Sequence, residues 1–190
     1  MSAPFLLVTG FGGFEDVVDN PSGELALRLG RRPDVTGIQL PVSFARAPDA
    51  LEGALAALPD PPAGILSMGV HPGSGFRIER QARAELSSDR PDMDGEVGTS
   101  LGWSGAALET GVDVEGLAQR IEGAGAAVSV SMDAGRYVCE CVFRQGLLHG
   151  RRLDIPALFL HVPPIEVMPT AEQLPVVELV VQHLLEQARR

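Results

Sequence analysis

The segment VSVSMDAGRYVCECVFRQGLL, residues 128–148, shows what kind of fold this chain adopts. Its first part, Val128–Met132, alternates apolar and polar residues as a strand does. Its second part, Tyr137–Leu148, reads as a helix that we expect Gly150 to cap. A short turn containing Gly135 joins the two parts. The segment is therefore a strand–turn–helix unit, the repeating element of α/β proteins.

The same alternation runs along the rest of the chain. Short apolar strands are expected at 5–8, 36–40, 64–68 and 155–161, and helices at 20–30, 48–58, 113–124 and from Thr170 onward. Asn20 is the expected N-cap of the first helix, and Thr170–Gln173 has the form of a capping box. The pattern predicts one domain over residues 1–190, an α/β/α sandwich around a mostly parallel twisted sheet.

One region departs from this alternation. Phe76–Arg80 alternates in polarity, and the segment through Leu86 predicts an extended arm or hairpin with one polar side. Residues 87–111 are rich in Gly, Ser, Asp and Pro, which indicates a long irregular loop. Long loops inside compact domains are usually functional or mobile, so the region 76–111 is a place to look for a site.

Composition excludes several classes of partner. The 190 residues carry 15 Arg, no Lys and 25 acidic residues, a net charge of -10 that opposes binding to nucleic acid or to anionic membranes. No apolar run approaches the about 20 residues that span a bilayer, and the first residues lack the basic start of a signal peptide. Cys139 and Cys141 are the only cysteines and form no disulfide framework, so we expect a cytoplasmic protein.

Reactive side chains gather where the predicted strands end. Ligands of open α/β sheets bind at the carboxyl ends of the strands. Four residues of reactive type lie in or beside these segments: His71, Asp133, Cys139 and His161. The search for a catalytic site therefore begins with a short set.

Cys139 is the best candidate for a nucleophile. It falls in the first turn of its helix, where unpaired amides and the helix dipole stabilise a thiolate and could hold an oxyanion. His161, at the end of the next strand, could act as its base. Taken singly, Cys139 could equally be a small buried apolar residue, and His161 a structural histidine. Cys141 lies about 200° around the helix and is expected in the core, with a Cys-x-Cys metal or redox site as a weaker reading.

Five blocks of sequence resemble one family of enzymes. They are Val8–Phe14, Leu40–Val42, Phe76–Arg80, Asp133–Cys139 and Phe159–Pro163. Their order and rough spacing resemble pyroglutamyl peptidase I, a family of cysteine peptidases that remove an N-terminal pyroglutamate from peptides. The resemblance covers nearly the whole chain and implies a homo-oligomer, either a dimer or a tetramer, without a metal or organic cofactor.

The resemblance also implies catalytic roles. Cys139 would be the nucleophile, His161 the base, and Glu79 the acid that orients His161. From the pattern alone, Glu79 would read as a solvated strand residue.

A set of pocket residues follows from the same resemblance. Phe11 and Phe14 match an aromatic pair that sandwiches the flat lactam ring, although ordinary core packing is the alternative for both. Tyr137 and Val138 match positions that line the ring pocket, and Val70 lies near the place where many bacterial members carry a Gln. Peptides with an N-terminal pyroglutamate would therefore be the substrates.

The sequence departs from the family pattern between Val70 and Arg90. The arginine that commonly follows the catalytic acid has no aligned match, since Arg90 is shifted by one place. An alternative hypothesis is therefore a non-catalytic or retuned homologue that binds another lactam or a blocked peptide terminus. An α/β enzyme that acts on nucleosides or phosphates is a further alternative, because Gly10–Gly13 resembles a phosphate loop, but no GK[ST] follows and the net charge opposes anions.

Overall fold

A six-stranded sheet forms the centre of the molecule in the computed structural model, which describes residues 3–15, 17–99, 103 and 105–189. Its strands lie in the order β2 (Val35–Leu40), β1 (Leu6–Phe11), β3 (Gly64–Val70), β10 (Ala157–Val162), β4 (Phe76–Glu79) and β9 (Val128–Ser131). β2, β1, β3 and β10 are mutually parallel; β4 runs antiparallel to β10, and β9 is parallel to β4. The carboxyl ends of β3 and β10 therefore meet at one edge.

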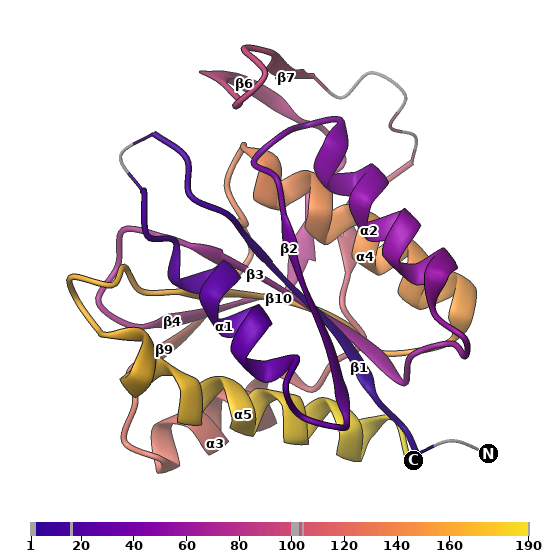
Figure 1. The fold of residues 1–190 in the computed structure, drawn as a ribbon, viewed down its shortest axis with the longest axis vertical. Coiled ribbons are helices and arrows are strands. Elements are labelled where there is room, and N and C mark those ends of the chain that lie inside the picture. Colours follow the sequence, from indigo (N-terminus) through magenta and orange to yellow (C-terminus); the bar gives the residue numbers. More distant parts are fainter. Residues whose placement is uncertain (1–2, 16, 100–102, 104, 190) are drawn as a thin grey trace.

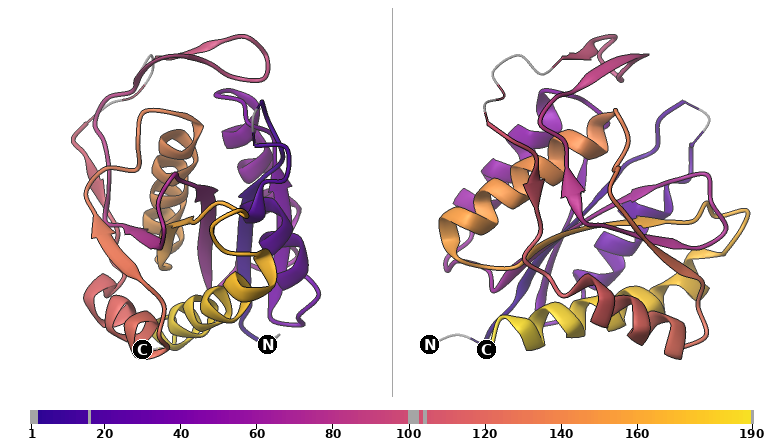
Figure 2. Two further views of the ribbon diagram at one scale, coloured as in Figure 1. Left: turned by 90° about the vertical axis from the view of Figure 1, so that its left-hand side faces the viewer. Right: turned by 180° about the vertical axis from the view of Figure 1, so that it is seen from behind.

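Helices cover both faces of this sheet (Figures 1 and 2). One layer contains α1 (Pro21–Leu29), α3 (Val114–Gly123) and α5 (Thr170–Gln187), and the other contains α2 (Arg46–Ala57) and α4 (Val138–Leu153). Each layer packs on the sheet through its own cluster of buried apolar side chains. The predicted α/β/α sandwich is confirmed. Among the described residues, no helix combines the length and the apolar character needed to cross a lipid bilayer.

The region 76–111 is partly inside the sheet and partly outside it. The expected arm at Phe76–Arg80 is instead the sheet strand β4, because Phe76 and Ile78 are buried and the strand is paired on both sides. The hairpin comes later: β6 (Ser87–Pro91) pairs with β7 (Val97–Thr99) and stands away from the layers (Figure 1). A small second pair joins β5 (Gln81–Ala82) to β8 (Leu108–Glu109).

Two expected helix caps are absent. Gly150 does not end α4, which continues to Leu153 and closes at Asp154 in the left-handed conformation, with φ 54°. Gly150 lies inside the helix, on the side that faces the sheet. A Cβ atom at this position would come within 2.9 Å of the Cβ of Ala157 on β10. The glycine therefore allows close packing of α4 on the sheet.

The start of α5 was predicted correctly, but its capping box does not form. Pro169 occupies the N-cap position, and the Thr170 hydroxyl donates to Glu24 Oε2 of α1 at 2.7 Å. This side chain joins two helices instead of capping its own. By contrast, α1 begins as predicted, with Asn20 Oδ1 accepting from the backbone N–H of Ser22 at 3.1 Å.

Candidate active site

Strand register brings Glu79 and His161 to the same face of the sheet. In the antiparallel pair of β10 and β4, Phe159 is opposite Glu79 and His161 is opposite Arg77. Because alternate strand residues share a face, all four side chains point to one side. A carboxylate, an imidazole and a guanidinium thus meet beneath the start of α4.

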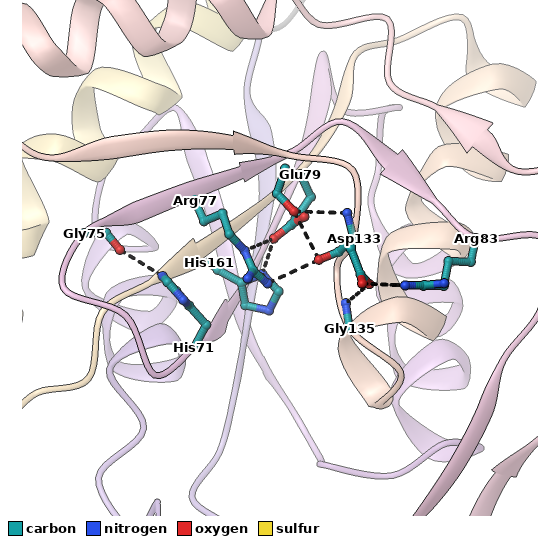
Figure 3. Close-up of polar contacts among 9 residues, drawn as sticks. His71, Gly75, Arg77, Glu79, Arg83, Asp133, Gly135 and His161 are labelled. Carbon is teal, nitrogen blue, oxygen red and sulfur yellow. Dashed lines mark hydrogen bonds and ion pairs between the residues drawn. The ribbon is translucent and has the colours of Figure 1, made fainter.

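Glu79 and His161 form a buried hydrogen-bonded pair. His161 Nδ1 lies 2.7 Å from Glu79 Oε1, and the two residues are 3% and 0% exposed (Figure 3). An ionised carboxylate only accepts, so Nδ1 carries the proton and donates it to the hydrogen bond. The neutral ring then keeps a lone pair on Nε2, which is the atom available to take a proton.

Arg77 joins Glu79 and His161 as a third group, and the sequence analysis did not identify it. Its Nε atom donates to the same Oε1 of Glu79 at 2.6 Å, and its terminal nitrogen donates to the backbone carbonyl of Asp133 at 3.3 Å. Figure 3 shows Arg77 and His161 both reaching Glu79. A cation beside a carboxylate that is fully buried offsets part of the cost of burying that charge. The i, i+2 spacing of Arg77 and Glu79 on a strand could have indicated it.

Cys139 is the second residue of α4 and so lies in the first turn of this helix, as the sequence predicted. Its thiol lies against Gly69 of β3. A Cβ atom on Gly69 would come within 2.8 Å of the Cys139 Sγ. Gly69 is also the register partner of His161. The absence of a side chain at Gly69 therefore lets the thiol reach the strand that neighbours the imidazole.

Burial at the site favours a neutral Cys139 thiol, in opposition to the helix dipole, which favours the thiolate. Burial raises the pKa of Cys139 to about 12, and the negative charge of Glu79 adds to the rise. Burial also lowers the pKa of His161, although the hydrogen bond to Glu79 opposes that shift. Desolvation disfavours both charged forms, so Cys139 and His161 are uncharged together near neutral pH.

The turn before α4 is held by its own polar contacts. Gly135 has φ +91°, a left-handed conformation that favours glycine, and its N–H donates to Asp133 Oδ1 at 2.9 Å. The Asp133 carboxylate also pairs with Arg83. Asp133, a reactive residue type in the sequence analysis, thus fixes the turn that presents Cys139.

A second buried carboxyl group belongs to Glu140, the residue that follows Cys139 in α4. Glu140 is 0% exposed, and its Oε1 atom accepts from the backbone N–H of Arg83 at 2.6 Å. Its Oε2 atom has no hydrogen-bond partner among the described residues. Burial raises the pKa of Glu140 to about 7. This group ties the residue that follows β5 to α4, and no feature of the sequence pattern indicated it.

A small pocket opens beside Cys139. About 90 Å³ of free space lies within it, several times what one water molecule needs. All five residues expected from the resemblance to line a ring pocket do line it, together with the thiol: Phe11, Phe14, Val70, Tyr137 and Val138. Phe11 is nearly buried at the end of β1, whereas Phe14 is partly exposed. The walls are mainly apolar and aromatic.

The β6–β7 hairpin completes the rim of the pocket. The Arg90 guanidinium lies 4.8 Å from the centre of the Tyr137 ring and forms an ion pair with Glu15 at 2.6 Å. The Tyr137 hydroxyl donates to the Pro91 carbonyl at 2.8 Å. Arg90 therefore lines the pocket although its position in the sequence is shifted relative to the family pattern.

His71 and Cys141, the two remaining candidates of the sequence analysis, are not among the lining residues of this pocket. His71 is partly buried, with its ring centre 5.7 Å from that of His161 in an edge-to-face arrangement. Its Nε2 lies 2.9 Å from the carbonyl oxygen of Gly75. Figure 3 draws this contact as a dashed line. Cys141 is a free buried cysteine that packs in the core and does not line the pocket.

A thiol at a helix start, with a buried imidazole and carboxylate at the same edge of an α/β sheet, is the arrangement typical of cysteine hydrolases. Comparison with known proteins narrows this class. Residues 5–187 match the family model of pyroglutamyl peptidase. The chain therefore belongs to the pyroglutamyl peptidase family.

Individual relatives agree with this assignment. A pyrrolidone-carboxylate peptidase of Pseudomonas fluorescens strain SBW25 is 32% identical over 180 residues, 90% of this chain and 83% of the relative. One of Lacticaseibacillus paracasei is 30% identical over 172 residues, 83% of this chain and 77% of the relative. The crystal structure of the pyrrolidone carboxyl peptidase of Fervidobacterium islandicum AW-1 superimposes with a TM-score of 0.87 at 26% identity, over 97% of this chain and 99% of that one.

Proposed function

We propose that this protein hydrolyses the bond between an N-terminal pyroglutamyl residue and the next residue of a peptide, with Cys139 as nucleophile, His161 as base and Glu79 as the residue that orients His161. The observation that carries the proposal is that Cys139 lines one small apolar pocket together with Phe11 and Phe14. The activity named for the family and its relatives supports the same reaction.

The pocket fits the recognition of a lactam. A pyroglutamyl ring is flat and uncharged, with two apolar faces and an amide edge, so aromatic walls suit its faces. Phe11, Phe14, Tyr137, Val138 and Val70 are proposed to hold it, with its exocyclic carbonyl carbon next to the Cys139 thiol. A free N-terminal amino group would enter this pocket only after loss of its hydration, which disfavours ordinary peptides.

In the first half of the reaction the Cys139 sulfur attacks the pyroglutamyl carbonyl carbon. His161 Nε2 takes the thiol proton as the carbon–sulfur bond forms, which a neutral thiol and a neutral imidazole require. Backbone N–H groups at the start of α4 would hold the oxyanion. When the carbon–nitrogen bond breaks, His161 returns that proton to the leaving amine, and a thioester remains on Cys139.

Water completes the cycle. His161 takes a proton from a water molecule that attacks the thioester carbon, the carbon–sulfur bond breaks, and the proton goes to the sulfur. Pyroglutamic acid leaves, and the thiol is restored. Each transient imidazolium is stabilised by Glu79 Oε1, 2.7 Å from Nδ1. All proton transfers use side chains and water, so the proposed reaction needs no metal or organic cofactor.

A chromogenic amide assay tests the proposal. We expect the protein to hydrolyse a pyroglutamyl aryl amide and not the corresponding prolyl amide, which has a ring of similar size but a charged ring nitrogen and no lactam carbonyl. Cys139→Ala should abolish the hydrolysis, and Cys141→Ala, a matched change two residues away, should retain it. Loss of activity in both variants, or in neither, would contradict the assignment of Cys139.

The alternative is a homologue that binds a lactam or a blocked terminus without hydrolysing it. Its support is the departure from the family pattern between Val70 and Arg90. The same assay separates the two hypotheses, since such a protein would bind pyroglutamyl peptides, detectable by a rise in melting temperature, without turnover.

The setting of the activity follows from composition and family. We propose that the protein acts in the cytoplasm, where two free thiols stay reduced, and that its partners are peptides with an N-terminal pyroglutamate. Nucleic acids and membranes are not expected partners at a net charge of -10. A homo-oligomer, dimer or tetramer, is proposed from the family resemblance, and light scattering at several concentrations tests it.

A further inference from the structure

A larger groove continues from the ring pocket toward the surface. The two depressions share Val17, Val70 and Arg90, so they form one continuous hollow. The outer part, here called the outer groove, has a volume of about 370 Å³. Its other lining residues include Val18, Asp19, His71, Ile165 and Glu166. They come from the loops that follow β1, β3 and β10, at the carboxyl edge of the parallel strands.

The outer groove begins on the side of the site where His71 and His161 lie. His71 lines it, and the His71 ring centre lies 5.7 Å from that of His161. In the proposed reaction the leaving amine must lie beside His161 to receive its proton. The peptide chain that begins at this amine therefore starts next to His71, which lines the outer groove.

The charges in the outer groove are unequal. Asp19 and Glu166 are both exposed, and neither forms an ion pair within the described part of the chain. The single arginine, Arg90, is paired with Glu15. The outer groove thus contains two carboxylates without an ion-pair partner among the described residues, together with apolar side chains such as Val18, which is 75% exposed. This combination suits a side chain with an apolar stem and a positive end, such as lysine or arginine.

We propose that the outer groove binds the first two residues after pyroglutamate, and that Asp19 and Glu166 give the enzyme a preference for a positively charged side chain at one of them. This inference rests on the proposed function, because it assigns the leaving part of the same substrate. Charge attraction at exposed sites raises encounter and binding more than it changes the chemical step, so the preference acts through kcat/KM.

Two sets of short peptides test the preference. The first set is pyroglutamyl-X-alanine amide and the second is pyroglutamyl-alanine-X amide, with X as Lys, Gln or Glu; release of the new amino terminus is measured. We expect kcat/KM for Lys to exceed that for Glu by about tenfold in at least one set, with Gln between them. The ratio should fall in 0.5 M salt, which screens exposed charges.

Variants separate local attraction from the field of the whole acidic protein. Asp19→Asn/Glu166→Gln should bring the Lys-to-Glu ratio close to one. The control Glu52→Gln/Glu122→Gln removes the same number of charges at exposed positions on α2 and α3 and should leave the ratio high. An equal loss of preference in both double variants would show a general field effect and overturn the outer groove as its source.

The uncharged aryl amide keeps this test separate from the proposed function. If the wild-type protein cleaves pyroglutamyl aryl amide but shows no difference between Lys and Glu peptides, the outer groove inference is wrong and the proposed function stands. If it cleaves neither the aryl amide nor any peptide, the proposed function itself fails.

Discussion

The polar centre of the site and the pocket beside it are built in opposite ways. Glu79 and His161 lie on adjacent paired strands and are almost completely buried. Phe14, Tyr137 and Arg90, by contrast, come from loops, a helix cap and a projecting hairpin, and all three are partly or fully exposed. Strand register fixes the proposed chemistry, whereas loops shape the proposed recognition. Changes at the centre should therefore affect kcat, and changes in the pocket should affect KM.

The largest effect is expected from removal of the base. His161→Ala should lower kcat for a pyroglutamyl aryl amide by about 10⁴-fold with little change in KM, because a neutral thiol cannot lose its proton without His161. The control His183→Ala alters a histidine of α5 that lies 3.5 Å from Arg120 of α3, in the helix layer that does not contain Cys139, and it should retain activity. A rise in KM without a fall in kcat would place His161 in binding instead.

Glu79→Gln should lower kcat by less than His161→Ala does. The amide keeps the size of the side chain but removes the charge that stabilises the imidazolium, so kcat should fall by about 10² to 10³-fold. Glu79→Asp, which restores the charge, should recover part of the activity if its shorter side chain still reaches Nδ1. Equal kcat values in wild type and Glu79→Gln would show that Glu79 serves the fold alone.

Substitutions in the ring pocket should change KM more than kcat. Phe14→Ala removes an aromatic wall, and we expect KM to rise by about tenfold while kcat stays within about threefold. Leu27→Ala, at a half-exposed apolar residue of α1, is the control and should change neither constant. A fall in kcat as large as that of Glu79→Gln would break the proposed division between chemistry and recognition.

The smallest effect concerns stability rather than activity. The folded pKa of Glu140, about 7, lies above its ordinary value of 4.5, so the folded state binds more protons than the unfolded state between these values. The free energy of unfolding should therefore fall as pH rises from about 4.5 to 7, by about 3 kcal/mol from this group, and then level off. Glu140→Gln keeps an acceptor for the Arg83 N–H and removes this part of the pH dependence.

Urea unfolding between pH 4.5 and 8.5 measures the difference between wild type and variant. The exposed Glu122→Gln variant on α3 is the control and should follow the wild-type curve. If Glu140→Gln also follows the wild-type curve at every pH, burial does not hold the proton on Glu140.

Local sequence patterns predicted the elements and the position of Cys139. Asn20 and Pro21 mark the start of α1 correctly because an N-cap depends on a few neighbouring residues. Cys139 falls at the start of α4 for a similar reason, since strand, turn and helix follow one another directly. The corrections at Gly150 and Thr170 arise where contacts with another element replace the local signal, close packing on Ala157 in one case and a hydrogen bond to Glu24 in the other.

The polar centre could not be derived from local patterns. Glu79 reaches His161 only because β4 lies between β10 and β9 and pairs antiparallel with β10, a pairing between segments about 80 residues apart. The family resemblance indicated Glu79, but it carried no information on Arg77 or on Glu140. The roles of Arg77 and Glu140 arise from tertiary structure: Arg77 pairs with Glu79, which the fold buries, and Glu140 accepts from the N–H of Arg83, which is distant in sequence.

The central claim is that Cys139 becomes covalently bonded to the pyroglutamyl group, and acid quenching during turnover tests it directly. We predict that intact-protein mass spectrometry finds a fraction of the chain heavier by one pyroglutamyl group, and that peptide mapping locates this group on Cys139. Acylation of Cys141 with Cys139 unmodified, or attachment of the pyroglutamyl group to any other residue with Cys139 free, would contradict the account.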